Sequence, residues 1–260
     1  SMGDRQNIDD IFRQWPFEPG KLGVRLVAGD DGRDILQMRI DIGILQMEMS
    51  GRPDGFRPEG EESYLDLFVA KAYSQGEEFV LSEEDCREID REFVQFYHRR
   101  VCLLALREYG RARRDAEHTL ALMDFCKIHS PDDQWTMTHE QYRPFVMFHR
   151  IQAATLLALE EDDAELAVEE VNQGLDRLRD FFEQHDAEEE FDDNELVGSK
   201  ALLEVILERE PELAPAYFQL GLTCNMLGDV ECAKEALAKF LEIAPDDPDA
   251  ATAQSLLDYL

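Results

Sequence analysis

The sequence predicts a mostly α-helical protein, a solenoid of helical hairpins with a small N-terminal antiparallel β element. Three observations predict this fold. Residues 199–248 repeat with a period of 34 residues, apolar residues recur at helical spacing from residue 61 onward, and alternating apolar residues are confined to residues 22–50. A fixed period of this length is typical of solenoids built from helix–turn–helix units.

The C-terminal repeat has the residue types of a helical hairpin. A first helix is followed by a turn at Gly228-Asp229 and by a second helix that Pro245 ends. Gly221 and Ala233 are small where the two helices would cross, so we expect the backbones to approach closely. Shifted by 34 residues, the stretch matches itself at Lys200 and Lys234, Leu203 and Leu237, Leu207 and Leu241, and Pro211 and Pro245.

This pattern resembles the tetratricopeptide repeat (TPR). The signature sites of that family are occupied here by Tyr217, Leu220, Gly221, Ala233 and Pro245, whereas Cys224 replaces the usual aromatic residue and Phe240 the usual alanine. The resemblance implies a protein–protein interaction module in which the first helix of each hairpin lines a concave groove. Residues 36–107 also resemble uncharacterised bacterial proteins, some of which carry a UvrB/UvrC-type motif; that motif is absent here, so this likeness implies no function.

We expect four regions along the chain. Residues 1–60 form a short helix and a small sheet packed on the helices, and residues 61–185 form divergent TPR-like hairpins with long helices. Residues 186–198 are an acidic linker, and residues 199–260 form the TPR-like repeat with a C-terminal capping helix. Gly198-Ser199 is expected to lie at a turn or at a cloning junction.

The N-terminal region is predicted to begin with a helix over residues 7–14, followed by strands over 22–28 and 36–42. The alternation changes parity after Gly43, which predicts a bulge or bend there. Two turns at residues 52–55 and 57–60 each carry an arginine, and we expect Arg52 and Arg57 to pair with nearby carboxylates.

Two long hairpins follow. Ser82 with Asp85 predicts a capping box at the start of a helix through residue 107, with residues 109–129 as its partner. Thr138 with Gln141 predicts the start of a second long helix through residue 159, with residues 164–185 as its partner.

Composition limits the partners and the compartment. The 260 residues include 58 Asp and Glu against 26 Lys and Arg, a net charge of −32, which disfavours nucleic acid and anionic membranes. No apolar run approaches the roughly 18 residues of a membrane helix, so we expect a cytoplasmic protein. The five cysteines form no C-x-x-C pair, and most of them fall on apolar helix faces, where free cysteine packs as a small hydrophobic residue. We therefore expect a reducing compartment, without structural zinc or other cofactor.

No arrangement of side chains predicts catalysis. Asp115-x-x-His118 lacks the companion glutamates of a carboxylate metal site, and His139-Glu140 lacks the second histidine of H-E-x-x-H. There is no phosphate-binding loop, no dinucleotide fingerprint and no G-x-S-x-G. We therefore expect neither an enzyme nor a metal site.

A basic patch interrupts the acidic chain between His98 and Arg114. It has two open interpretations: it receives the acidic tail of a partner, or it neutralises the acidic linker of this chain. Its predicted members are Arg99, Arg100, Arg107, Arg111 and Arg114.

The TPR resemblance also implies an apolar concave groove. We expect the groove to be covered partly by Trp15-Pro16-Phe17 and partly by an amphipathic helix of a partner. The function expected is a non-catalytic adaptor or scaffold for another protein or peptide. The alternatives are a homo-oligomeric structural protein, or an enzyme or small-molecule binder near His98. The predicted groove residues are Tyr97, Val101, Leu104, Leu156, Leu159, Phe218, Leu222 and Asn225.

Overall fold

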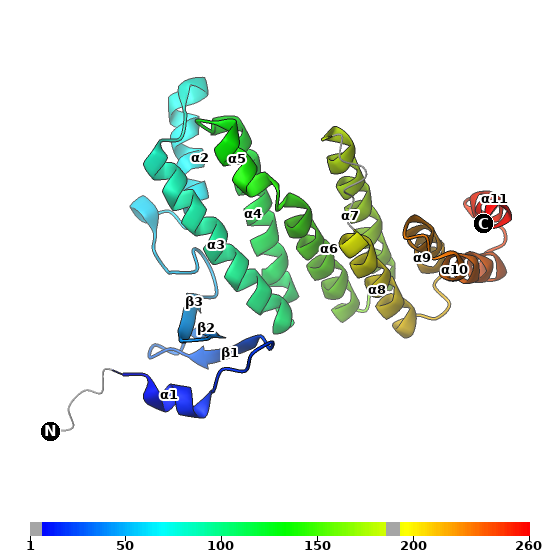
Figure 1. Ribbon diagram of the computed structural model, residues 1–260, viewed down its shortest axis with the longest axis horizontal. Coiled ribbons are helices and arrows are strands. Elements are labelled where there is room, and N and C mark those ends of the chain that lie inside the picture. Colours follow the sequence, from blue (N-terminus) through cyan, green and yellow to red (C-terminus); the bar gives the residue numbers. More distant parts are fainter. Residues whose placement is uncertain (1–6, 186–192) are drawn as a thin grey trace. The chain divides into compact units, whose positions relative to one another are not determined.

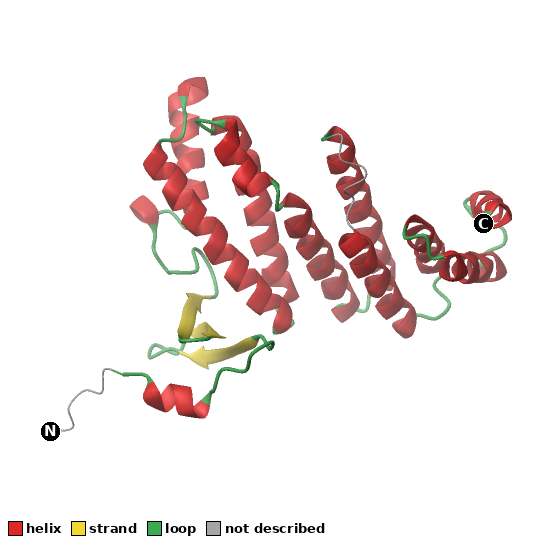
Figure 2. Cartoon of the chain, in the orientation of Figure 1, coloured by secondary structure: helices red, strands yellow, loops and turns green. Residues whose placement is uncertain are grey.

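A computed structural model describes residues 7–185 and 193–260 and has the predicted fold class, mostly α-helical with a small three-stranded antiparallel sheet (Figures 1 and 2). The chain forms two compact units. Unit 1 extends to Asp115 and includes Asp124–Asp133, and unit 2 comprises Ala116–Met123 and Gln134–Leu260. The division between the units falls inside helices, where no change of composition marks it. Each unit is described on its own.

The sheet belongs to unit 1 and has the strand order β1-β2-β3, with β1 at Gly23–Ala28, β2 at Asp34–Ile40 and β3 at Gly43–Glu48. Ile40 pairs with Gly43, so Asp41 and Ile42 form a two-residue hairpin turn. The predicted bulge after Gly43 is therefore wrong. The parity changes there because the chain reverses, and Ile42, placed in a strand by its alternation, is 88% exposed at the turn.

Aromatic residues of the N-terminal segment cover one face of the sheet. Helix α1 (Asp9–Gln14) is followed by Trp15, whose carbonyl accepts a hydrogen bond of 3.0 Å from Nε of the buried Arg39. The Phe12 ring lies 4.2 Å from the Arg39 guanidinium, and the Phe17 ring lies 6.0 Å from it. The prediction that Trp15-Pro16-Phe17 fills the helical groove is therefore wrong, because this segment packs on the sheet.

The two arginine-containing turns connect the sheet to the helices, through the short 3₁₀ helix η1 (Pro58–Gly60). The Gly55 and Gly60 amides donate to the Arg52 and Arg57 carbonyls, as turns require. Both arginines pair with nearby carboxylates, which confirms the prediction: Arg57 with Glu62 at 2.6 Å, and Arg52 with Asp54 at 3.4 Å. Unlike Arg57, Arg52 is 2% exposed and is therefore part of the interior.

Three helices follow the sheet in the chain, and the first two begin with clear capping interactions. Ser63 caps α2 (Tyr64–Gln75), which the 3₁₀ helix η2 (Gly76–Glu78) follows, and the predicted capping box of Ser82 and Asp85 starts α3 (Glu83–Ala105). Helix α4 spans Tyr109–His129, as predicted. Leu36 of β2 and Leu103 of α3 have no exposed surface.

Helices and the turns that join them make up the described residues of unit 2. Its helices are α5 (Asp133–Glu140), α6 (Arg143–Glu160), α7 (Ala164–Gln184), α8 (Asp193–Arg209), α9 (Ala214–Met226), α10 (Val230–Ile243) and α11 (Ala250–Tyr259). The predicted cap at Thr138 is wrong, because Thr138 lies inside α5 and donates its hydroxyl to the Trp135 carbonyl at 2.6 Å. The long helix instead begins at Arg143, with Pro144 in its first turn, where proline is tolerated.

Glycines mark the places where helices of unit 2 approach most closely. A Cβ atom added to Gly174 of α7 would lie 2.2 Å from Ile151 Cγ1 of α6, and one added to Gly198 would lie 2.3 Å from Phe148 Cζ. Gly198 is thus a contact site within α8, and the predicted turn at Gly198-Ser199 is wrong. The acidic linker is also shorter than predicted, because α8 includes residues 193–198; residues 186–192 lie outside the described residues.

Among the described residues, none of the helices combines the length and the hydropathy of a membrane-spanning segment.

Candidate functional site

The candidate site is the C-terminal hairpin of α9 and α10, which forms where the 34-residue repeat predicts it. Gly221 faces α10 so closely that an added Cβ would lie 2.6 Å from Leu237 Cγ, and Ala233 has no exposed surface. The predicted role of these small residues at the helix crossing is therefore confirmed. Asp229 caps α10 by accepting a hydrogen bond of 3.2 Å from the Cys232 amide. Lys200 of α8 donates to the other carboxylate oxygen of Asp229 at 2.9 Å, which connects the turn to the preceding helix.

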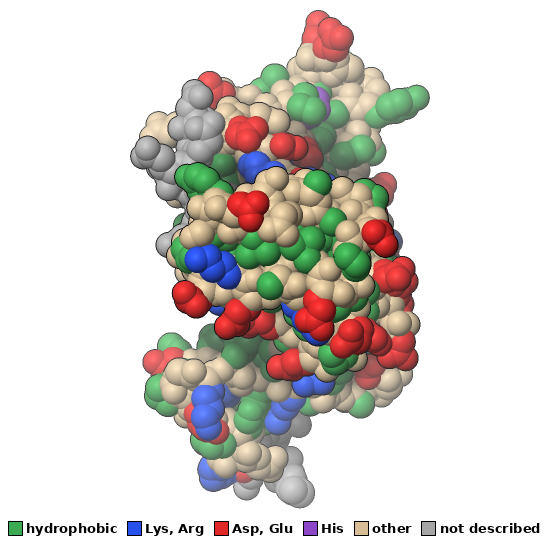
Figure 3. Space-filling model, turned by 90° about the vertical axis from the view of Figure 1, so that its right-hand side faces the viewer, with side chains coloured by type: hydrophobic (Ala, Val, Ile, Leu, Met, Phe, Trp, Pro, Cys, Tyr) green, Lys and Arg blue, Asp and Glu red, His purple; other side chains and the backbone are tan. Residues whose placement is uncertain are grey.

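Helix α9 has an unusual composition for this chain, since none of its 13 residues is charged. Its buried side faces α8 and α10, and Arg179 of α7 donates to Met226 Sδ at 4.0 Å. The predicted groove residues Phe218, Leu222 and Asn225 of this helix are half-buried, and Met226 is 39% exposed. Figure 3 views the side of unit 2 that carries α9–α11, where hydrophobic side chains form a band among Asp and Glu. We call Leu222, Asn225 and Met226 the α9 surface.

Phe218 is held more firmly than the α9 surface. Its ring lies 5.0 Å from the Phe240 ring of α10, and it packs against the core formed by Leu237, Phe240 and Ala253. Substitution of Phe218 would therefore disturb the hairpin as well as any surface around it, so Leu222 and Met226 are better positions for testing recognition.

The other predicted groove residues occupy different environments. Leu159 is 2% exposed, so its assignment to a groove surface is wrong, and Leu156 is half-buried against the same core of unit 2. Tyr97, Val101 and Leu104 lie on α3 of unit 1, where Tyr97 is exposed and the other two are half-buried. The repeat period places residues on a helix face, but it does not tell which of them the next helix covers.

The basic patch is largely internal. Arg99 is 3% exposed, and its guanidinium makes two hydrogen bonds of 2.8 Å to the buried carboxylate of Asp115 and one of 2.9 Å to the Glu48 carbonyl. Arg100 is 1% exposed; burial lowers its pKa to about 10, and the Asp115 charge opposes that shift. The prediction that Arg99 and Arg100 form a binding surface is therefore wrong.

The remaining arginines of the predicted patch lie nearer the surface. Arg107 and Arg114 are exposed, and Arg111 pairs with Glu108 at 2.9 Å. Arg107 has a left-handed backbone, with φ of 61°, in the turn between α3 and α4. His98, beside this region, is half-buried, and burial lowers its pKa.

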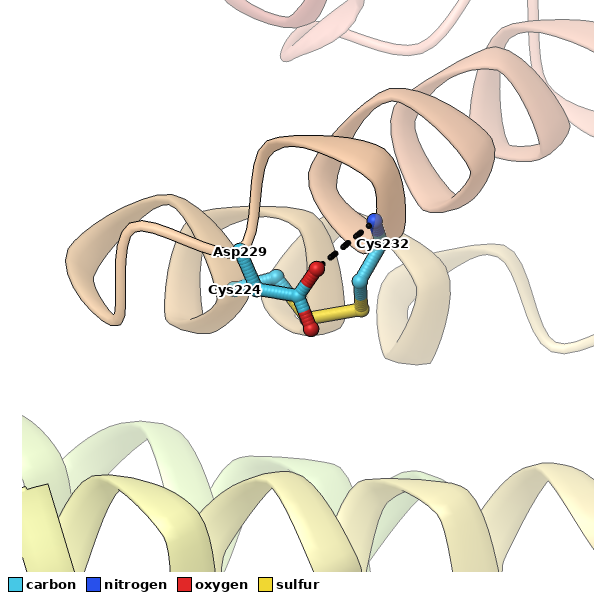
Figure 4. Close-up of side chains that lie close together, drawn as sticks. All are labelled: Cys224, Asp229 and Cys232. Atoms are coloured by element: carbon cyan, nitrogen blue, oxygen red, sulfur yellow. Dashed lines mark hydrogen bonds between the residues drawn. A yellow bond between two sulfur atoms is a disulfide. The ribbon is translucent and has the colours of Figure 1, made fainter.

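The cysteines fall into two groups, and only the first has the free thiols that we expect of a reducing compartment. Cys86, Cys102 and Cys126 are free and buried, as expected. Cys224 and Cys232 instead form a disulfide that joins α9 to α10 across the turn (Figure 4). A spacing of eight residues matches no cysteine motif that the sequence could reveal. The antiparallel hairpin brings the two Cα atoms to 5.8 Å from each other. With Asp229 these cysteines form a potential metal-ligand cluster, but in the disulfide neither sulfur is a thiolate.

Comparisons with known proteins assign no family. No family model matches the chain, and no curated protein matches it. A solved structure described as "DHF119 filament" is similar at 16% sequence identity, over 75% of this chain and 87% of that one, with a TM-score of 0.31. Similarity at this level carries no argument about function.

Proposed function

We propose that this chain is a non-catalytic, TPR-like adaptor that recruits another protein through the α9 surface. The observation that carries the proposal is the composition of α9. On a chain with a net charge of −32, this helix has no charged residue, and it leaves Leu222, Asn225 and Met226 partly accessible. A helix with no charge on its outer side is typical of a surface that another apolar segment covers.

The partner we propose is an amphipathic helix that carries basic residues on its polar face. Apolar side chains at spacings of three and four would pack against Leu222 and Met226, and Asn225 would provide a hydrogen-bonding group between them. The net charge of −32 favours lysine and arginine at the rim of the interface. An acidic tail is a poorer partner, because Arg99 and Arg100 are buried.

A site-specific photo-crosslinking experiment tests this proposal. A photoreactive residue replaces Met226, and in a matched control it replaces Val197, which is 55% exposed on α8 of the same unit. Each protein is incubated with a lysate of its source organism, irradiated and analysed by mass spectrometry. We expect a discrete partner adduct from position 226 and none from position 197.

A charge variant makes the test specific. Leu222→Glu places a carboxylate in the α9 surface and should abolish the adduct at position 226, whereas Val197→Glu should leave it unchanged. Equal adducts from both positions, or an adduct that survives Leu222→Glu, would contradict the proposal. An adduct with a second copy of this chain would favour the homo-oligomer instead.

A further inference from the structure

The disulfide of the C-terminal hairpin joins two sulfurs in unequal environments. Cys224 lies in the last turns of α9 and has no exposed surface, whereas Cys232 lies in the first turn of α10 and is half-buried. A reagent from solution therefore reaches Cys232 first. Figure 4 shows the pair beside Asp229 at the turn.

The position of Cys232 also favours its thiolate. Cys232 is the third residue of α10, where the unpaired amides and the dipole of a helix N-terminus stabilise negative charge. The neighbouring Asp229 carboxylate acts in the opposite direction. That carboxylate, however, is bound by the Cys232 amide and by the Lys200 ammonium, which neutralises much of its effect.

The three free cysteines of unit 1 lack these properties. Cys86, Cys102 and Cys126 are 7%, 0% and 1% exposed, respectively. Burial raises the pKa of Cys86 to about 11 and that of Cys102 to about 12, so both remain thiols near neutral pH. Cys232 is thus the cysteine that combines access to solvent with an environment that stabilises a thiolate.

We propose that Cys232 and Cys224 form a thiol–disulfide exchange site whose co-reactant is a low-molecular-weight disulfide. In the reduced protein, the Cys232 thiolate attacks one sulfur of the small disulfide, forms a mixed disulfide and releases one small thiolate. Cys224 then loses its proton and attacks Cys232 Sγ, which forms the intramolecular disulfide and releases the second small thiolate. The protein pair loses two electrons and the small disulfide gains them. Thiols of the same class reverse the sequence.

Two single variants of the full chain test the order of these steps, with glutathione as the probe. Each variant is treated with oxidised glutathione and analysed by intact mass and peptide mapping. Cys224→Ala removes the resolving thiol and should accumulate one glutathione on Cys232. Cys232→Ala should accumulate none, because Cys224 and the three cysteines of unit 1 are all buried. Both variants lack the disulfide, so any loss of stability is matched between them, and circular dichroism verifies that each is folded.

The wild-type chain provides the second measurement. After equilibration with mixtures of reduced and oxidised glutathione, accessible thiols are alkylated and located by peptide mapping. We expect Cys224 and Cys232 to change together from alkylated to protected as the oxidised fraction rises, while the thiols of unit 1 stay unlabelled. An adduct on Cys224, an adduct in neither variant, or a pair that stays protected in excess reduced glutathione would overturn the proposal. Each result is independent of whether the α9 surface binds a partner.

Discussion

Removal of the Asp115 carboxylate should strongly destabilise unit 1. Asp115 is 5% exposed and accepts two hydrogen bonds of 2.8 Å from Arg99, whose third contact is the Glu48 carbonyl. Asp115→Ala would leave a guanidinium buried without its counter-charge. Breaking a buried ion pair in this way costs about 3–5 kcal/mol, because the remaining charge stays desolvated. This is a large part of the roughly 5–15 kcal/mol that stabilises a typical domain.

The two tryptophans of the chain make this loss measurable. Trp15 is in unit 1 and Trp135 is in unit 2, so a Trp135→Phe background leaves Trp15 as a fluorescent reporter of unit 1. Urea unfolding of this background is compared with and without Asp115→Ala. Arg114→Ala is the control, since Arg114 is exposed on the same helix. We expect the control to change the free energy of unfolding by no more than about 0.5 kcal/mol.

A double variant separates the pair from its individual members. Arg99→Met with Asp115→Leu replaces both charges by apolar side chains, and such replacements of a buried pair are often close to neutral. The double variant should therefore unfold at a higher urea concentration than Asp115→Ala. If Asp115→Ala costs no more than Arg114→Ala, the pair behaves like an exposed one, and the assignment of Arg99 to the interior would be refuted.

Three further predictions concern packing, redox state and pH. Gly174→Ala should lower the melting temperature, because a methyl group close to Ile151 costs about 1–3 kcal/mol by overpacking, whereas alanine gains about 1 kcal/mol in helix propensity. A higher melting temperature would contradict the close crossing of α6 and α7. Reduction of the Cys224–Cys232 bond, which spans eight residues, should cost about 2.5 kcal/mol through the entropy of the unfolded chain, measured by urea unfolding with and without reductant. Burial lowers the pKa of His98 below its ordinary 6.5, so the folded protein binds a proton there less readily than the unfolded chain does. Stability is therefore lost as the pH falls below about 6.5, and His98→Gln should flatten this fall in melting temperature.

Local signals predicted most helix ends, since capping depends on residues close in sequence. Ser82 and Asp85 mark the start of α3, and Gly228-Asp229 marks the turn before α10. The same type of signal was misleading at Thr138, where a capping pattern lies inside α5. A cap requires that the preceding backbone is not helical, and the pattern of side chains alone does not contain that information.

The candidate site was predicted less completely, because it depends on contacts between distant residues. The partner of Arg99 lies 16 residues away on the next helix, and a run of arginines looks the same in sequence whether it faces water or Asp115. Cys224 and Cys232 are likewise brought together only by the hairpin. The TPR resemblance pointed to Phe218 and Leu222, and the absence of charge over the 13 residues of α9 is a further signal that the sequence contains.

The burial of arginines also affects which charge on a partner the protein surface attracts. Among the described residues, five arginines and four carboxylates are buried, so burial takes no net negative charge away from the accessible surface. The basic run near residue 100 adds little positive charge to the surface, because Arg99 and Arg100 are buried. The electrostatic field then favours basic partners over long distances, mainly by raising the rate of association at low salt. Affinity would come instead from the apolar contacts with Leu222 and Met226. Added salt should therefore slow the capture of a basic amphipathic helix more than it speeds its release.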